Sequence, residues 1–165
     1  MTAADVTHAQ LEEVFEDLKE KARPIIESGQ EHMPMLLFYE NLDGKLELGH
    51  VQAVRMRNEA DKAKVARLIN AALSQWKVCD AVILVCESWT LKLPKGIGLR
   101  EARALAESLA GRGFEYHPDR CAALMTNFYT RGQQFTVQNK ITGTGKDRRV
   151  TFGTLPCREN SMLAN

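Results

Sequence analysis

The sequence predicts a single α+β domain, residues 1–155, whose mostly antiparallel sheet of about six strands packs against three helices. The chain of 165 residues is long enough to bury one hydrophobic core without disulfides or metal ions. Its 44% hydrophobic and 26% charged residues are typical of globular proteins. Apolar patterns follow the order α-β-β-α-β-α-β-β-β, and hairpins mixed with helices favour a sheet that helices cover on one face.

The first forty residues predict an amphipathic helix followed by a strand. Thr7 is the expected N-cap of the helix, and Gly29 marks its end. Two strand-like runs, 35–40 and 45–54, flank the turn signal Asp43-Gly44 and therefore predict a β-hairpin. The helix carries its apolar residues at helical spacing: Leu11, Val14, Phe15, Leu18, Ala22, Ile25 and Ile26.

A second helix and a central strand follow the hairpin. Asn58 is the expected cap of the helix, and one apolar stripe runs from Val65 to Trp76, so we expect Trp76 in the core between helix and sheet. The unbroken apolar run 81–86 predicts a strand that is buried on both faces. A third helix is expected from Leu99 to about residue 111.

The last part of the chain predicts a three-stranded meander over 121–129, 134–141 and 148–154, and residues 156–165 are expected to form a flexible tail. In the middle strand, apolar and polar residues alternate, which places Phe135 in the core. The turn that contains Gly143 and Lys146 resembles a Walker loop only superficially, because it joins two strands and lacks the required spacing.

Neither a signal sequence nor a membrane span is predicted, and we expect a cytoplasmic protein without membrane partners. The 4 cysteines are widely spaced and form no Cys-x-x-Cys pair, so we expect reduced thiols. No metal site and no cofactor are predicted. His50 is interpreted as a surface residue rather than a ligand.

Two motifs flank the third helix: Glu87-Ser88-Trp89 and His117-Pro118-Asp119-Arg120. If their strands are antiparallel neighbours, these motifs meet at one rim of the sheet. The rim then offers Glu87, His117, Asp119 and Arg120 for acid–base chemistry, anion binding or a divalent metal. The favoured alternative is a tight turn in which Arg120 pairs with Glu87 across the strands.

A strand that ends in Glu-x-Trp, with His-Pro-x-Arg before the next strand, resembles small uncharacterised proteins of bacteria and their phages. The resemblance covers residues 81 to about 125. It implies a bacterial or phage origin, and it implies no activity.

Two further sets of residues are candidates for anion binding. Lys95, Gly96 and Gly98 precede a helix, where backbone N–H groups can cradle a phosphate, although a plain loop is the favoured interpretation. Acids outnumber bases in residues 1–40, and bases outnumber acids from residue 95 onwards. The meander carries five nucleic-acid-binding candidates, for which a solvated sheet edge is the favoured interpretation: Arg131, Lys140, Lys146, Arg148 and Arg149.

The lack of a complete catalytic constellation favours a small, non-enzymatic binding or regulatory protein that acts on a protein partner through its surface. The acidic first helix and the basic meander are the expected contact faces. One alternative is a hydrolase or metal-dependent nuclease built on the rim residues. Another is nucleic-acid binding by the meander. The sequence leaves the oligomeric state open.

Overall fold

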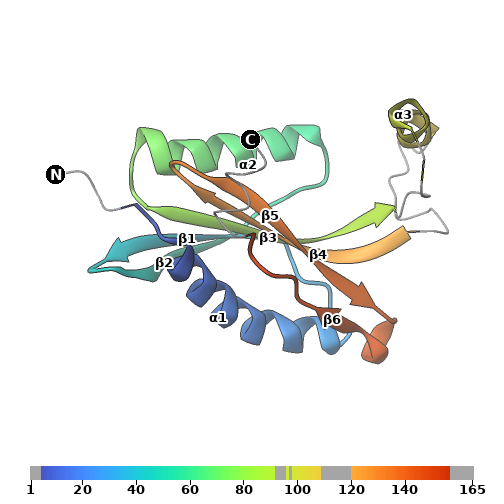
Figure 1. The fold of residues 1–165 in the computed structure, drawn as a ribbon, viewed down its shortest axis with the longest axis horizontal. Helices are drawn as coiled ribbons and strands as arrows, with labels where there is room; N and C mark the ends of the chain where they lie inside the picture. Colours follow the sequence, from blue (N-terminus) through green and yellow to red (C-terminus); the bar gives the residue numbers. More distant parts are fainter. Residues whose placement is uncertain (1–4, 92–95, 97, 109–119, 157–165) are drawn as a thin grey trace.

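The computed structural model describes residues 5–91, 96, 98–108 and 120–156. A six-stranded sheet with the order β2-β1-β3-β4-β5-β6 forms its centre, and every neighbouring pair is antiparallel (Figure 1). The α+β class and the predicted element order are confirmed. The elements are α1 (His8–Glu27), β1 (Met35–Leu42), β2 (Lys45–Ala53), α2 (Glu59–Asn70), the π-helix η1 (Ala71–Gln75), β3 (Ala81–Leu91), α3 (Leu99–Ser108), β4 (Arg120–Thr130), β5 (Gln134–Thr142), the 3₁₀-helix η3 (Gly145–Asp147) and β6 (Arg149–Thr151).

Helices cover both faces of the sheet, so the prediction of one covered face was wrong. Helix α1 lies on one face, and α2 with η1 lies on the other (Figure 1). Both faces need to be covered because the central strands are apolar and successive side chains of a strand point to opposite faces of the sheet. In β3, Ile83 and Val85 pack toward α1, whereas Val82 and Leu84 pack toward α2. Burial of β3 on both faces was predicted and is confirmed.

Helix α1 closes the larger core. Its N-terminus is a capping box between Thr7 and Gln10, which satisfies backbone groups that a helix end leaves free. Phe15 packs edge-on against Phe128 of β4, with ring centroids 5.6 Å apart. The segment after β6 returns to this helix, since the Phe152 ring lies 6.2 Å from that of Phe15. The tail predicted from residue 156 lies outside the described residues from 157 onwards.

The end of the second helix departs from the predicted pattern. Asn58 caps α2 as expected, and Val65 and Ile69 are buried. The helix then widens into η1, where the Trp76 N–H donates to the Ala71 carbonyl, 2.7 Å away and five residues back. A π turn places the next side chain out of phase with the 3.6-residue stripe. Trp76 is therefore 61% exposed, and the prediction that it lies in the core was wrong.

Helix α3 stands away from the rest of the molecule, beyond the ends of β3 and β4 (Figure 1). The part of this helix predicted after Ser108 lies outside the described residues. In the part of the chain that the structure describes, no helix is both long and apolar enough to cross a bilayer.

Candidate functional site

The predicted rim site is not assembled among the described residues. Strands β3 and β4 are antiparallel neighbours, as expected, and the register sets Glu87 opposite Leu124 and Arg120 opposite Leu91. At about 3.3 Å per residue, the backbones of Glu87 and Arg120 are therefore about 13 Å apart along the strands. His117 and Asp119 lie outside the described residues.

The carboxylate of Glu87 binds Arg148, a partner that was not predicted from the sequence. One of its oxygens accepts a hydrogen bond from the Arg148 guanidinium, and the other accepts one from the His32 backbone N–H. Arg148 also donates to the Gln30 carbonyl at 2.9 Å. The Glu87 and Arg148 side chains are only 11% and 12% exposed. This Glu87–Arg148 link ties the connection after α1 to the sheet, and it leaves no free carboxylate oxygen for catalysis.

The basic residues of the meander divide into two groups. Arg131 donates to the carbonyls of Leu73 at 2.9 Å and Cys79 at 2.8 Å, and it forms an ion pair with Asp80 at 2.9 Å. Arg131 and Arg148 are therefore fixed by structural contacts. The three other candidates are exposed: Lys140, Lys146 and Arg149.

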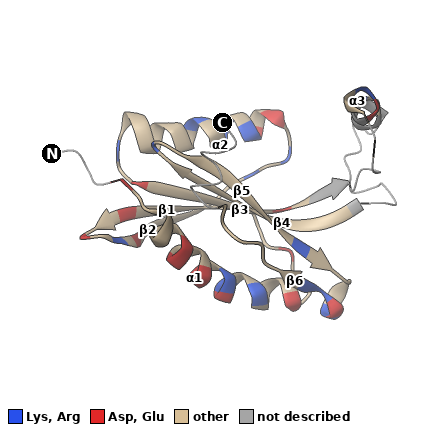
Figure 2. Cartoon of the chain, in the orientation of Figure 1, with Lys and Arg blue, Asp and Glu red and all other residues tan. Residues whose placement is uncertain are grey.

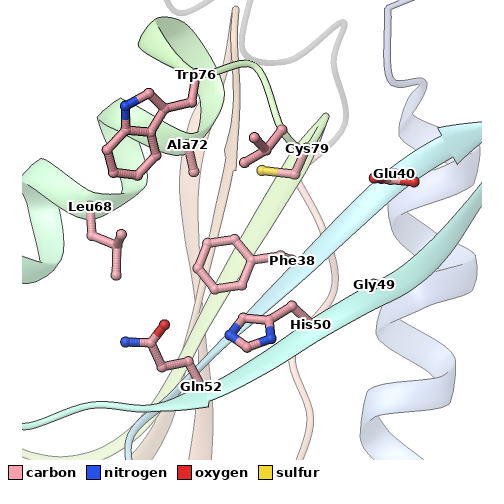
Figure 3. Close-up of a pocket in the computed structure, with 10 residues that line it drawn as sticks. Phe38, Glu40, Gly49, His50, Gln52, Leu68, Ala72, Trp76 and Cys79 are labelled. Atoms are coloured by element: carbon pink, nitrogen blue, oxygen red, sulfur yellow. The ribbon is translucent and has the colours of Figure 1, made fainter.

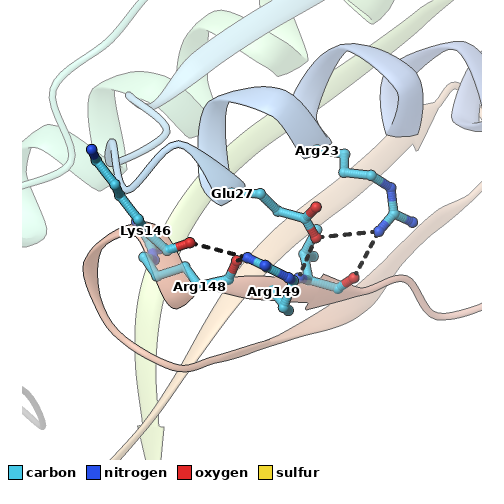
Figure 4. Close-up of polar contacts among 6 residues, drawn as sticks. Arg23, Glu27, Lys146, Arg148 and Arg149 are labelled. Carbon is cyan, nitrogen blue, oxygen red and sulfur yellow. Dashed lines mark hydrogen bonds and ion pairs between the residues drawn. The ribbon is translucent and has the colours of Figure 1, made fainter.

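Arg149 turns back onto its own strand. Its guanidinium donates to the Lys146 carbonyl at 3.1 Å and to that of Arg148 at 2.7 Å (Figure 4). On the neighbouring side of the same region, Glu27 of α1 accepts from Arg23 and from the Val150 N–H. These local contacts hold β6 against α1. Along α1, the first half carries acids and no Lys or Arg, and acids and bases mix in the second half (Figure 2).

The two glycine turns make local contacts among the residues that the structure describes. The Gly98 N–H donates to the Glu101 carboxylate at 3.3 Å, so the first turn of α3 is capped by its own acidic side chain. Lys95 lies outside the described residues, and Gly96 is exposed. Gly143 has φ +79°, and a Cβ there would lie 2.3 Å from the Asp147 carbonyl oxygen. A tight turn explains this glycine, as the sequence predicted.

A groove that the sequence did not predict lies between α2–η1 and the hairpin β1–β2 (Figure 3). It encloses a cavity of about 300 Å³. Trp76 and Leu68 form the helical wall, and Phe38 forms the floor. The His50 ring packs beside Phe38, with centroids 5.5 Å apart. We call this feature the groove, and its lining consists of Phe38, Glu40, Gly49, His50, Gln52, Leu68, Ala72, Trp76, Val78 and Cys79.

Two carboxylates lie at the end of the groove nearest the β1–β2 turn. Glu40 lines the groove and lies directly opposite Glu47 in the β1–β2 ladder. Like charges at such a cross-strand position repel each other. Lys45 approaches Glu47 at 4.0 Å, with both side chains largely exposed. No residue of the described ranges is seen to pair with Glu40, so this end of the groove is acidic.

The groove lacks an activated nucleophile. Burial raises the pKa of the Cys79 thiol to about 11, and the nearby Arg131 offsets this only in part. The thiol is therefore protonated at neutral pH, whereas covalent catalysis requires the thiolate. Within the described ranges, no three His, Cys, Asp or Glu side chains are grouped so that they could hold a metal ion. The arrangement is suited to binding an apolar group.

Sequence reasoning missed the groove because its residues come from four separate segments. Alternation across the predicted hairpin could not reveal this face, because a bulge at Gly49 is what brings His50 and Gln52 onto the face of Phe38 and Glu40. Comparisons with protein families, with curated proteins and with solved structures found no match to this chain. The groove therefore provides the structural evidence for a function.

Proposed function

We propose that this protein is a non-enzymatic binding protein and that the groove is its recognition site. The observation that carries the proposal is the exposed indole of Trp76 beside an open apolar cavity. The groove therefore replaces the acidic first helix and the basic meander as the proposed contact face. On α1, two acids are already paired with lysines of the same helix, Glu16 with Lys19 at 2.7 Å and Asp17 with Lys21 at 2.9 Å.

An exposed indole contributes favourable free energy to binding when a partner covers it. A tryptophan buries about 150–250 Å² when it is covered, and covering the exposed part of Trp76 is worth about 3 kcal/mol at 25 cal/mol per Å². Tryptophan is accordingly among the residues that dominate protein interfaces. Val78, which also lines the groove, is exposed as well. A partner that covers both side chains keeps only part of this energy as affinity, because ordering of the two proteins opposes binding.

The size of the groove favours a side chain of a protein partner over a large cofactor. Its volume of about 300 Å³ lies at the lower limit of ordinary ligand pockets. Its polar groups are few, and Gln52 and His50 lie at its margin (Figure 3). Such a site provides apolar contact with little fixed hydrogen-bonding geometry. We infer that a bulky apolar side chain of a partner protein inserts here.

Selection from a random displayed peptide library tests this proposal. Peptides selected on the native protein should bind Trp76→Ala about tenfold more weakly, because their anchor loses its aromatic wall. Leu99→Ala is the matched control, since Leu99 is an exposed apolar residue on α3. Its affinity should equal that of the native protein. Peptides that bind Trp76→Ala as well as the native protein, or no selected peptides at all, would contradict the proposal.

A further inference from the structure

We propose that the occupant of the groove is an extended peptide segment that adds to the outer edge of β2 as an additional strand. It places a bulky apolar side chain in the groove and a lysine or arginine beside Glu40 and Glu47. This inference rests on the proposed binding function and specifies the chemistry of the partner. Three features of the hairpin carry it: the open edge, the side chains on the two faces of β2 and the acidic end.

The first feature is the edge of β2. Strand β2 is nine residues long and stands at the end of the sheet order, with β1 on one side. None of the described strands pairs with its other side. An unpaired edge presents a row of main-chain donors and acceptors, which is the template that peptides use in strand addition. The groove opens beside this edge, so one segment can bind both.

The second feature is the distribution of β2 side chains over the two faces of the sheet, which a bulge at Gly49 shifts by one residue. His50 lies opposite Phe38 and Gln52 opposite Leu36, so both face the groove. Leu48 and Val51 lie opposite Tyr39 and Leu37, on the other face of the sheet, and are 44% and 48% exposed. An added regular strand would alternate its side chains between these two faces. Every second side chain would then reach the groove, and the others would cover Leu48 and Val51.

The third feature is charge. The opposed carboxylates of Glu40 and Glu47 repel each other at the end of the groove. A lysine or arginine two positions from the inserted side chain would lie beside them and remove this repulsion. The long aliphatic stems of these side chains also suit an apolar floor such as Phe38. An acidic residue at the same position would add a third negative charge. The groove therefore favours a peptide with a basic residue there over one with an acidic residue.

The experiment uses two blocked nonapeptides, Thr-Val-Lys-Thr-Phe-Thr-Lys-Val-Thr and the same sequence with both lysines replaced by glutamate. Lysines on both sides of phenylalanine place one near the acidic pair in either strand direction. Calorimetric titration should show that the lysine peptide binds at least about tenfold more tightly at low salt. Glu40→Gln combined with Glu47→Gln should reduce this preference to about twofold or less. Glu12→Gln with Glu13→Gln, on the exposed face of α1, is the charge-matched control and should preserve the preference.

Two backbone-methylated forms of the lysine peptide test strand addition. Successive N–H groups of a strand point to opposite sides, so methylation of alternate residues blocks only one edge. One methylation pattern should abolish binding, and the other should be tolerated. Bound peptide should also slow amide hydrogen exchange in β2. Equal effects of the two patterns, or unchanged exchange in β2, would overturn the inference.

The outcomes separate the inference from the proposed function. Binding of both nonapeptides that depends on Trp76 but not on lysine would overturn the inference and leave the function in place. Absence of any Trp76-dependent binding, in this assay and in the library selection, would overturn both. A dimer in sedimentation, with β2 amides protected before peptide is added, would show that a second copy occupies the edge, and it would overturn the inference.

Discussion

The two faces of the sheet are covered to different extents. On the α1 side, the core extends across all strands from Leu46 of β2 to Val150 of β6. On the α2 side, the cluster of buried apolar residues in the described part of the chain takes its strand members from β1 and β3. A helix is about 10–12 Å wide and neighbouring strands are about 4.8 Å apart, so one helix parallel to the strands covers about two of them.

Helix α1 avoids this limit because of its length and direction. It has 20 residues, contacts both edge strands β2 and β6, and is supplemented by the segment that contains Phe152 and Leu155. Helix α2 has 12 residues, and the connection before it adds only the partly buried side chains of Val54 and Met56. The groove is the apolar part of the surface that α2 leaves uncovered. Stability is therefore expected to depend mainly on the α1 side, and recognition on the α2 side.

The largest expected effect contrasts two aromatic residues. Phe15→Ala should lower the free energy of unfolding by about 3–5 kcal/mol, because it removes a fully buried ring from the α1 core. Trp76→Ala should lower it by about 1 kcal/mol or less, because the indole is mostly in water. Urea unfolding of the two variants measures the difference. Equal losses would show that Trp76 is packed in solution and that the two faces do not differ as described.

The Glu87–Arg148 link provides the next largest effect. Arg148→Met should cost about 2–4 kcal/mol, because it leaves the carboxylate of Glu87 nearly buried without its counter-charge. Arg148→Met combined with Glu87→Met should cost less than Arg148→Met alone, since no unpaired charge remains. Urea unfolding at neutral pH measures both variants. A double variant that is less stable than Arg148→Met would show that the pair contributes more than the removal of an unpaired charge explains.

Tyr39 gives a pH-dependent test of the α1 side. Burial, and secondarily the charge of Asp17, raises the pKa of Tyr39 from 10.0 to about 12. Because the folded-state value is the higher one, the neutral phenol stabilises the fold below pH 10, and this contribution of about 2–3 kcal/mol is lost as the pH rises through 12. Unfolding free energies measured from pH 8 to 11.5 should fall more steeply for the native protein than for Tyr39→Phe. Parallel curves would mean that this phenol is hydrated.

Much of the fold could be predicted from the sequence, and the exceptions have physical causes. The stripe of α1 and the unbroken run of β3 indicate their elements correctly because hydrophobic periodicity is a local property. The exposure of Trp76 depends on one π turn, which shifts the phase of the helix without a clear sequence signal.

The candidate site was less predictable than the fold. The partner of Glu87 depends on strand register and on the path of the chain into β6, so the nearest arginine in the predicted ladder was not the observed one. The groove depends on where α2 lies relative to β2, which no single segment encodes. Alternation in the hairpin does not indicate its face either, because the bulge at Gly49 moves His50 and Gln52 to the face of Phe38.

The smallest effect concerns the residue that ends η1. Lys77 has φ +50°, in the left-handed region, while the Val78 N–H donates to the Ala72 carbonyl at 3.0 Å. This is the geometry of a helix end at which glycine is usual. Lys77→Gly should therefore raise the free energy of unfolding by about 0.5–1 kcal/mol, because glycine adopts this conformation without steric cost.

Lys77→Ala separates this backbone effect from the effect of charge, since alanine removes the ammonium group but keeps the Cβ atom. Its stability should remain at or below that of the native protein. If Lys77→Gly is more stable and still binds the lysine nonapeptide with native affinity, the turn only terminates the helix. If it is more stable but binds more weakly, the strained residue also holds Trp76 in its outward position. Equal stability of Lys77→Gly and Lys77→Ala would show that the turn carries no strain in solution.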